Sequence, residues 1–180
     1  MKPSSLQELY IEQLRDLYDA ENQIIKALPD MIEAASSPEL KEALNEHLEV
    51  TKTQASRLEQ IFSKLGEKPK GDKCKGMQGV LQEGSDLVED IDDTNVRDAA
   101  IIASAQRVEH YEMAGYGTAR TFATLLGEDD ASTLLEQTLD EEKEADDKLT
   151  ELAEDINVEA QSGKDVRGDK SRTGSRRKIA

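Results

Sequence analysis

Apolar residues recur at helical spacing along four long stretches of this chain, at about residues 5–35, 38–65, 95–126 and 129–157. Residues that begin or end helices separate these stretches: Ser37-Pro38 follows the first, Gly66 the second and Gly127 the third. Pro29 lies inside the first stretch and predicts a kink there. Only 3% of the residues are aromatic, which is unusual for a sheet protein. The 180 residues therefore predict one all-α domain built on four long helices.

A long connection separates the second stretch from the third. Residues 66–79 are rich in Gly and Lys, and residues 80–91 form an amphipathic piece that predicts a brief helix. A connection of this length allows the second and third bundle helices to run parallel, as in the ferritin-like topology with its single crossover. We therefore predict a ferritin-like four-helix bundle with a long crossover between helices two and three.

The net charge of −16 is distributed unevenly along the chain. Residues 160–180 are basic and nearly free of apolar side chains, so we expect residues 1–159 to form the bundle and 160–180 to form a disordered tail. An acidic body disfavours binding to nucleic acid, because phosphate neutralisation dominates that binding. We expect contact with nucleic acid only weakly through the tail, which is equally suited to acidic lipid or the acidic body of a second copy.

Cysteine usage and hydropathy favour a soluble cytoplasmic protein. The single cysteine, Cys74, has no partner for an internal disulfide, and the first ten residues lack an apolar signal region. No stretch approaches the roughly 20 apolar residues of a membrane-spanning helix. Lys73 and Lys75 flank Cys74 and would favour its thiolate, whereas packing against the bundle would make it a spectator.

Carboxylates fall on the apolar faces of three of the predicted helices. Glu21 lies among leucines and isoleucine on the first helix, Glu109 and Glu112 lie on the third, and Glu142 and Asp146 lie on the fourth. Burying an unpaired carboxylate is costly, so something must neutralise these groups. A buried salt bridge or an error in helix phase explains a single inward acid, but five acids on three helices favour bound divalent cations.

The second helix offers fewer candidate ligands. Its phase places His47 and Gln54 inward and Glu49 outward, unless a π-bulge re-aims Glu49. His110 is expected at the surface, and Tyr18 is expected to face inward, where it would either pack or hydrogen-bond a ligand. Iron, as two ions, is the expected cofactor, with manganese or zinc as alternatives. The predicted metal ligands are Glu21, His47, Gln54, Glu109, Glu112, Glu142 and Asp146.

Seven short motifs, taken in order over about residues 5–157, resemble the YciE/YciF-type ferritin-like family, a bacterial stress-associated group. The resemblance implies a four-helix bundle with a di-iron site, usually a dimer, and no assigned reaction. The family commonly has a second Glu after His-Leu-Glu, where this chain has Val50, so a ligand on helix two is absent. The motifs are Leu-Tyr-Asp-Ala-Glu at 17–21, His-Leu-Glu at 47–49, Arg-Leu-Glu-Gln-Ile-Phe at 57–62, Cys-Lys-Gly-Met-Gln-Gly at 74–79, Val-Arg-Asp-Ala-Ala at 96–100, Val-Glu-His-Tyr-Glu at 108–112 and Glu-Glu-Lys at 141–143.

These observations leave three expected functions. The first is a stress-associated protein whose di-iron or di-manganese site oxidises Fe(II) or removes peroxide, as a ferroxidase or peroxidase would. The second is a non-enzymatic homodimeric stress or interaction protein whose metal site is structural or incomplete, which the residue Val50 favours. The third is iron storage in a cage like that of the mini-ferritins, whereas the resemblance implies a dimer.

Overall fold

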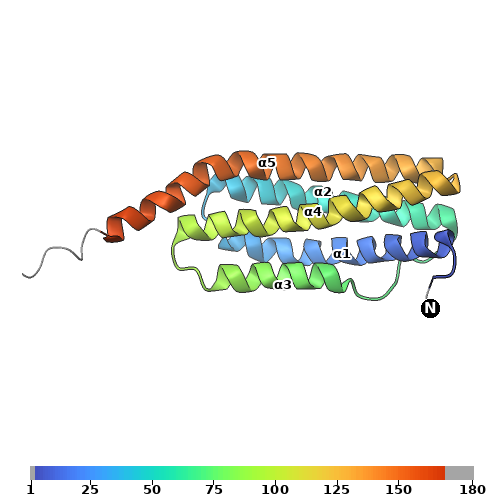
Figure 1. Ribbon diagram of the computed structural model, residues 1–180, viewed down its shortest axis with the longest axis horizontal. Helices are drawn as coiled ribbons and strands as arrows, with labels where there is room; N and C mark the ends of the chain where they lie inside the picture. The colour runs from blue at the N-terminus through green and yellow to red at the C-terminus, as the bar shows by residue number, and fades with distance from the viewer. Residues whose placement is uncertain (1–2, 169–180) are drawn as a thin grey trace, which may run out of the picture.

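Five α-helices make up the computed structural model, which describes residues 3–168; within that range there is no β-strand (Figure 1). The four long helices of the bundle match the four periodic stretches of the sequence. The predicted short helix in the crossover is also present, and it begins earlier than expected. The bounds are α1 Leu6–Ala34, α2 Pro38–Leu65, α3 Lys75–Glu89, α4 Thr94–Leu126 and α5 Asp129–Gly168.

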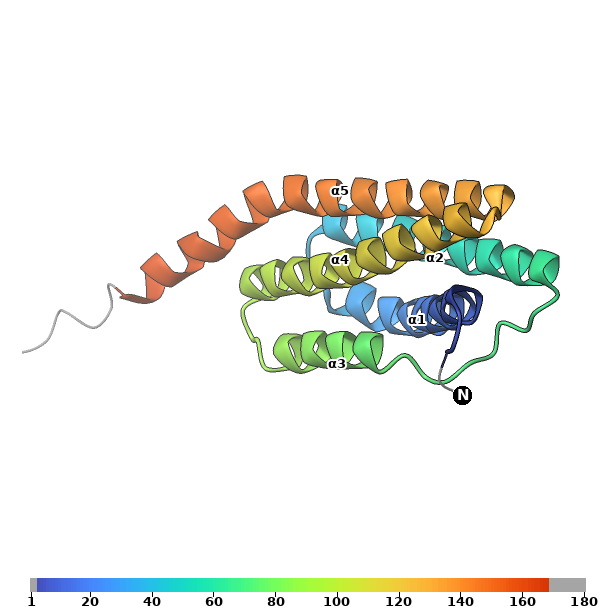
Figure 2. The ribbon, with the colours of Figure 1, turned by 45° about the vertical axis from the view of Figure 1, so that its right-hand side comes forward.

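The order of the helices in space is that of a ferritin-like bundle. Helices α1 and α2 form one antiparallel hairpin, and α4 and α5 form a second (Figures 1 and 2). The crossover through α3 returns the chain to the opposite end of the bundle, so that α2 and α4 run in the same direction. Helix α3 packs along the outside of α1 and α4. The predicted fold and the position of its long crossover are confirmed.

Local capping explains where the helices begin and end. The hydroxyl of Ser37 accepts a hydrogen bond from the backbone N–H of Leu40 at 3.2 Å, with Pro38 at the first helical position. Gly66 and Gly127 end α2 and α4 with φ values of 68° and 77°, a left-handed conformation that glycine adopts without steric cost. The Sγ atom of Cys74 accepts from the N–H of Met77 and caps α3, which accounts for its early start.

The core consists of two apolar clusters at different levels along the bundle. One is built around residues such as Ile24, Leu44 and Ile101, and the other includes Leu58 and Tyr116. Between these levels, each of the four bundle helices carries polar or acidic side chains that are also buried. A polar layer therefore crosses the bundle with an apolar cluster on either side.

Asp98 fastens the start of α4 to the turn between α1 and α2. Its buried carboxylate accepts hydrogen bonds from the backbone N–H groups of Ser36 at 2.8 Å and Ser37 at 2.7 Å. We expect Asp98→Ala to lower the free energy of unfolding by about 2–4 kcal/mol, because two backbone N–H groups lose a charged acceptor. Urea denaturation measures this change, with the exposed Asp86→Ala on α3 as the control. A loss below about 1 kcal/mol would contradict this role for Asp98.

Helix α5 continues past the end expected at residue 157. Ile156 is the last buried side chain among those that the structure describes on this helix, and the helix continues to Gly168 beyond the bundle (Figure 2). Residues such as Glu, Ala and Gln favour a helix even where packing does not support it, which accounts for the extension. The predicted tail is therefore helical from residue 160 to 168, and its residues 169–180 lie outside the described range. Among the described helices, none combines the length and the hydropathy of a membrane span.

Candidate metal centre

The polar layer between the two apolar clusters holds four carboxylates. Glu21 comes from α1, Glu109 and Glu112 from α4 and Glu142 from α5, and each is at most 2% exposed. His47 reaches the same layer from α2. One potential ligand atom from each of four residues lies within 4.8 Å of the others, and these residues are His47, Glu109, Glu112 and Glu142. Three helices thus bring a compact set of oxygen and nitrogen donors into the middle of the bundle.

The carboxylates are poorly satisfied by the surrounding protein. Both oxygens of Glu112 lack hydrogen-bond partners among the described residues, and so does one oxygen each of Glu21, Glu109 and Glu142. Unpaired buried carboxylates are destabilising, and natural proteins rarely retain them without a compensating group. Hard oxygen donors at this spacing fit a divalent cation, which would neutralise several carboxylates together.

Burial and mutual repulsion change the acidity of the cluster. The pKa values of Glu21, Glu109 and Glu112 are raised well above that of an ordinary carboxyl, first by burial and then by neighbouring carboxylates. The pKa of His47 is lowered from its ordinary value, chiefly by burial, although Glu142 opposes this effect. His47 is therefore neutral at neutral pH, the form in which imidazole binds metals, and its Nε2 lies 3.4 Å from Oε1 of Glu109.

Glu21 lies next to the group of four rather than within it. It is close enough to Glu112 and Glu142 for both to affect its pKa, and the hydroxyl of Tyr116 donates a hydrogen bond to its Oε1. Helical phase alone offers such a hydrogen bond to Tyr18 as one of two alternatives. That alternative is wrong, because Tyr18 donates instead to Glu59 at 2.6 Å, outside the layer, and packs edge-on against Phe62.

Gln54 acts as a hydrogen-bond donor to the acids. Its Nε2 donates to Oε1 of Glu142 and, at 3.3 Å, to Oε2 of Glu141. Its Oε1 has no hydrogen-bond partner within the described part of the chain. The structure therefore places Gln54 where it orients Glu142, and this predicted ligand is turned with its amide nitrogen toward the carboxylates.

Asp146 lies outside the compact group of four, at the partly buried edge of the layer, and its charge still helps to raise the pKa of Glu109. Its carboxylate accepts from Nε2 of Gln106 at 3.1 Å and lies 3.3 Å from Nε2 of His110. His110 is mostly exposed, as predicted, and Glu49 also faces solvent, where it pairs with Lys52. One helical turn thus separates the fully buried Glu142 from Asp146, whose side chain is 20% exposed.

Arg57 is a buried cation that is not among the residues predicted for the site. From α2 it donates to Oγ1 of Thr138 at 2.6 Å and to both oxygens of Glu141, at 2.8 and 2.9 Å. Its charge also acts to lower the pKa of Glu21, against the larger effects of burial and Glu142. Its spacing in the sequence could have indicated that Arg57 is buried, because it is three residues from Gln54 and lies on the same face of the helix.

Cys74 is a packed thiol rather than a reactive one. The pKa of the Cys74 thiol is raised, chiefly by burial, and this effect outweighs any effect of the flanking lysines. The Sγ atom lies 3.0 Å from the hydroxyl of Tyr111. The thiol also donates to the carboxylate of Asp16 at 3.2 Å. Of the two alternatives, the spectator role fits this environment.

Comparison with known proteins places the chain in a family. Residues 5–162 match the family described as a domain of unknown function, DUF892. Protein YciF of Escherichia coli strain K12 is 42% identical over 164 residues, which cover 90% of this chain and 99% of YciF. The crystal structure of YciF, which is described as a stress protein, aligns with the present structure with a TM-score of 0.84. The alignment covers 87% of the present chain and 99% of YciF.

Two further solved structures share the fold. YcfI, described as a putative structural protein from Rhodopseudomonas palustris, is 47% identical with a TM-score of 0.80, covering 82% of this chain and 94% of that one. A Bacillus anthracis protein described as ferritin-like and diiron-carboxylate aligns at 17% identity and a TM-score of 0.65. The alignment covers 84% of the present chain and 99% of the Bacillus anthracis chain. The resemblance found in the sequence motifs is confirmed: the chain belongs to the DUF892 family, which includes the stress protein YciF.

Proposed function

We propose that the buried carboxylate layer binds two divalent metal ions, and that iron is the physiological one. The observation that carries this proposal is the set of buried carboxylate oxygens without partners, gathered around a neutral imidazole. Two irons would supply Fe(II)/Fe(III) chemistry toward dioxygen or peroxide. The description of the Bacillus anthracis protein as diiron-carboxylate gives independent support from a shared fold.

The donors divide into two overlapping sets. His47, Glu109, Glu112 and Glu142 would hold one ion, because their ligand atoms already lie together. The second ion would rely on Glu21, with Glu112 and Glu142 shared between the ions. Glu21 lies beside both of these acids, and its Oε2 has no partner among the described residues. Since this second set has fewer donors of its own, we expect weaker binding there.

Neighbouring groups would keep the donors in position during binding and reaction. Tyr116 fixes one oxygen of Glu21, and Gln54 fixes one oxygen of Glu142, so each acid presents its other oxygen to the layer. The carboxylates would release their protons as cations enter, because the cations replace protons as the neutralising charge. The apolar clusters on either side limit the access of water.

Iron loading followed by an oxidation assay tests this function. Protein expressed with iron should contain two irons per chain by elemental analysis, and it should oxidise added Fe(II) faster than buffer, with dioxygen or with peroxide. Fe(II) serves here as the substrate. Two bound irons with oxidation at the buffer rate would contradict the enzymatic part of the proposal, and absence of bound metal would contradict all of it.

A non-enzymatic stress or interaction protein is the second candidate. Val50 lies on α2 beside the layer, where the family resemblance leads us to expect a further carboxylate, and only one set of four donors is compact within the described residues. YcfI is itself described as a putative structural protein. In this case bound metal raises the melting temperature without oxidising Fe(II).

We further propose that the protein is a cytoplasmic homodimer. Sedimentation equilibrium measures the number of chains in the assembly and so tests the dimer.

A further inference from the structure

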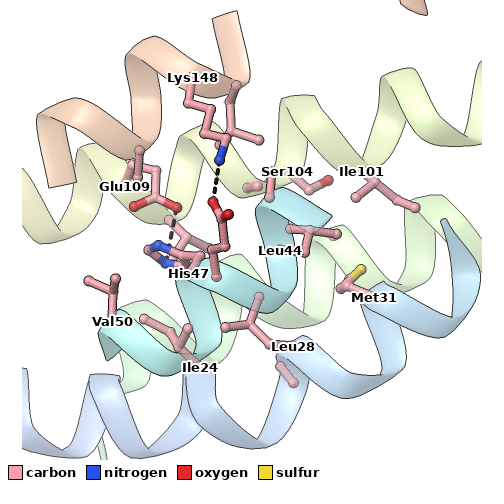
Figure 3. A pocket seen from close by; sticks show the side chains of 18 of the residues that line it. Ile24, Leu28, Met31, Leu44, His47, Val50, Ile101, Ser104, Glu109 and Lys148 are labelled. Atoms are coloured by element: carbon pink, nitrogen blue, oxygen red, sulfur yellow. Dashed lines mark hydrogen bonds and ion pairs between the residues drawn. The ribbon is translucent and has the colours of Figure 1, made fainter. Parts of the chain in front are cut away.

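A partly open apolar cavity of about 280 Å³ lies between the helices next to the metal centre (Figure 3). All five helices contribute to its wall, and most of the lining side chains are aliphatic, including Ile24, Leu28, Leu44 and Ile101. For comparison, an apolar cavity of ~150 Å³ in another protein is large enough to bind benzene. The cavity therefore has room for a molecule about twice that size.

Polar side chains interrupt the apolar wall. His47 and Glu109, which also belong to the metal centre, line one part of the cavity. Ser104 of α4 is 6% exposed, and its hydroxyl has no hydrogen-bond partner among the described residues. Gly84 of α3 faces it, and a Cβ atom there would come within 3.3 Å of that hydroxyl. Glycine lets α3 pack closely against Ser104 without bringing a polar group to it, so the Ser104 hydroxyl still has a hydrogen bond to offer a ligand atom.

Charged residues surround the side of the cavity between α2 and α5. Lys148 of α5 pairs with Glu46 of α2, and both side chains are about half exposed (Figure 3). Glu141 and Glu144 also line the cavity. Arg57 pairs with Glu141 and Lys148 pairs with Glu46, which leaves Glu144 without an ion pair among the described residues. An anionic ligand would therefore meet an excess of negative charge, whereas a neutral ligand would not. An exposed ion pair also contributes little free energy, so it opposes entry only weakly.

We propose that this cavity binds a small neutral apolar molecule that carries one hydroxyl or carbonyl oxygen. Its apolar body packs against the aliphatic wall, and its oxygen hydrogen-bonds to Ser104. The wall belongs to the bundle itself, so binding does not require the metal ions and the inference goes beyond the proposed function. Because His47 and Glu109 border the cavity, the bound molecule lies next to the metal centre.

Naphthol is a suitable probe, with naphthalene and naphthoate as its apolar and anionic counterparts. Titrations by fluorescence and calorimetry use the full-length protein, first without metal and then loaded with iron. Ala105→Leu on α4 and Ala145→Leu on α5 place a larger side chain in the cavity wall. Ala103→Leu is the matched control, because Ala103 is exposed on the same helix as Ala105. Circular dichroism and metal analysis show whether each variant folds and still binds metal.

The wild type should bind naphthol more tightly than naphthoate. We expect Ala105→Leu and Ala145→Leu to weaken naphthol binding about tenfold or more, because each leucine fills part of the space that naphthol would occupy and the packed wall yields little. Ala103→Leu should leave the binding unchanged. Ser104→Ala should weaken naphthol binding about fivefold while sparing naphthalene, the effect of one lost hydrogen bond.

Three results would overturn the inference. They are no binding of naphthol to the wild type, tighter binding of naphthoate, or unchanged affinity in a folded Ala105→Leu or Ala145→Leu protein. An unchanged naphthol affinity in Ser104→Ala would overturn the assignment of the ligand oxygen. Should Ala105→Leu fail to fold, Ala145→Leu decides the point from the other side of the cavity. Naphthol binding by a protein that takes up no metal would support this inference and contradict the proposed function.

Discussion

Glu112→Gln should abolish metal binding and, at the same time, stabilise the metal-free protein. Both oxygens of Glu112 lack hydrogen-bond partners among the described residues, and the carboxyl lies among other buried acids. A glutamine of nearly the same shape removes one acid and supplies an N–H₂ group that can donate to the remaining carboxylates. Loss of groups that merely support a ligand costs about 10–100-fold in metal affinity, so loss of this direct ligand should cost at least about 100-fold.

Metal content and thermal unfolding measure the two halves of this prediction. Elemental analysis after iron or manganese loading should show Glu112→Gln nearly free of metal, and its melting temperature in the presence of a chelator should exceed that of the wild type. Glu49→Gln is the matched control, because the Glu49 side chain is 71% exposed and faces away from the layer. Full metal content in Glu112→Gln would remove this residue from the site.

The metal-free protein should lose stability as the pH rises from about 5 to about 8. The pKa values of Glu21, Glu109 and Glu112 are raised, so these groups keep their protons in the folded state when the unfolded chain has released them. The stabilisation is complete below the ordinary carboxyl pKa of 4.5 and is lost as the pH passes the raised values. The pKa of His47 is lowered from 6.5, so this group adds stability as the pH rises. It is a single group, whereas three carboxyl groups act in the other direction.

Melting temperatures in a chelator, measured across this pH range, test the prediction. The wild type should fall by several degrees toward high pH, and Glu112→Gln should fall less, because one of the responsible groups is gone. The comparison between the two proteins also separates this effect from the general repulsion of a chain with a net charge of −16. Saturating Mn(II) should reduce the fall in the wild type. An equal fall in both proteins would show that the buried carboxyls do not cause it.

Much of the fold follows from local sequence signals. The apolar period located the four bundle helices, and Ser37, Gly66 and Gly127 marked their ends, because capping depends on a few neighbouring residues. The same period identified Glu21 and Glu142 as buried, since an acid between apolar neighbours on one helical face has few other places to lie.

The rest depends on contacts between helices that one helix alone does not specify. Asp146 has nearly the same phase as Glu142, but Gln106 and His110 of α4 hold it at the edge of the bundle. Tyr116 rather than Tyr18 contacts an acid of the buried layer, and Arg57 is buried because Thr138 and Glu141 of the facing helix accept its hydrogen bonds. Such partners lie far apart in the sequence, so helical phase gives no information about them.

Anomalous diffraction from crystals grown with Mn(II) tests the central claim most directly. The proposal predicts two anomalous peaks inside the bundle, one among His47, Glu109, Glu112 and Glu142 and a second, weaker one beside Glu21. Crystals of Glu112→Gln grown in the same way should lack both peaks. Peaks confined to the protein surface, with none in the buried carboxylate layer, would contradict the account.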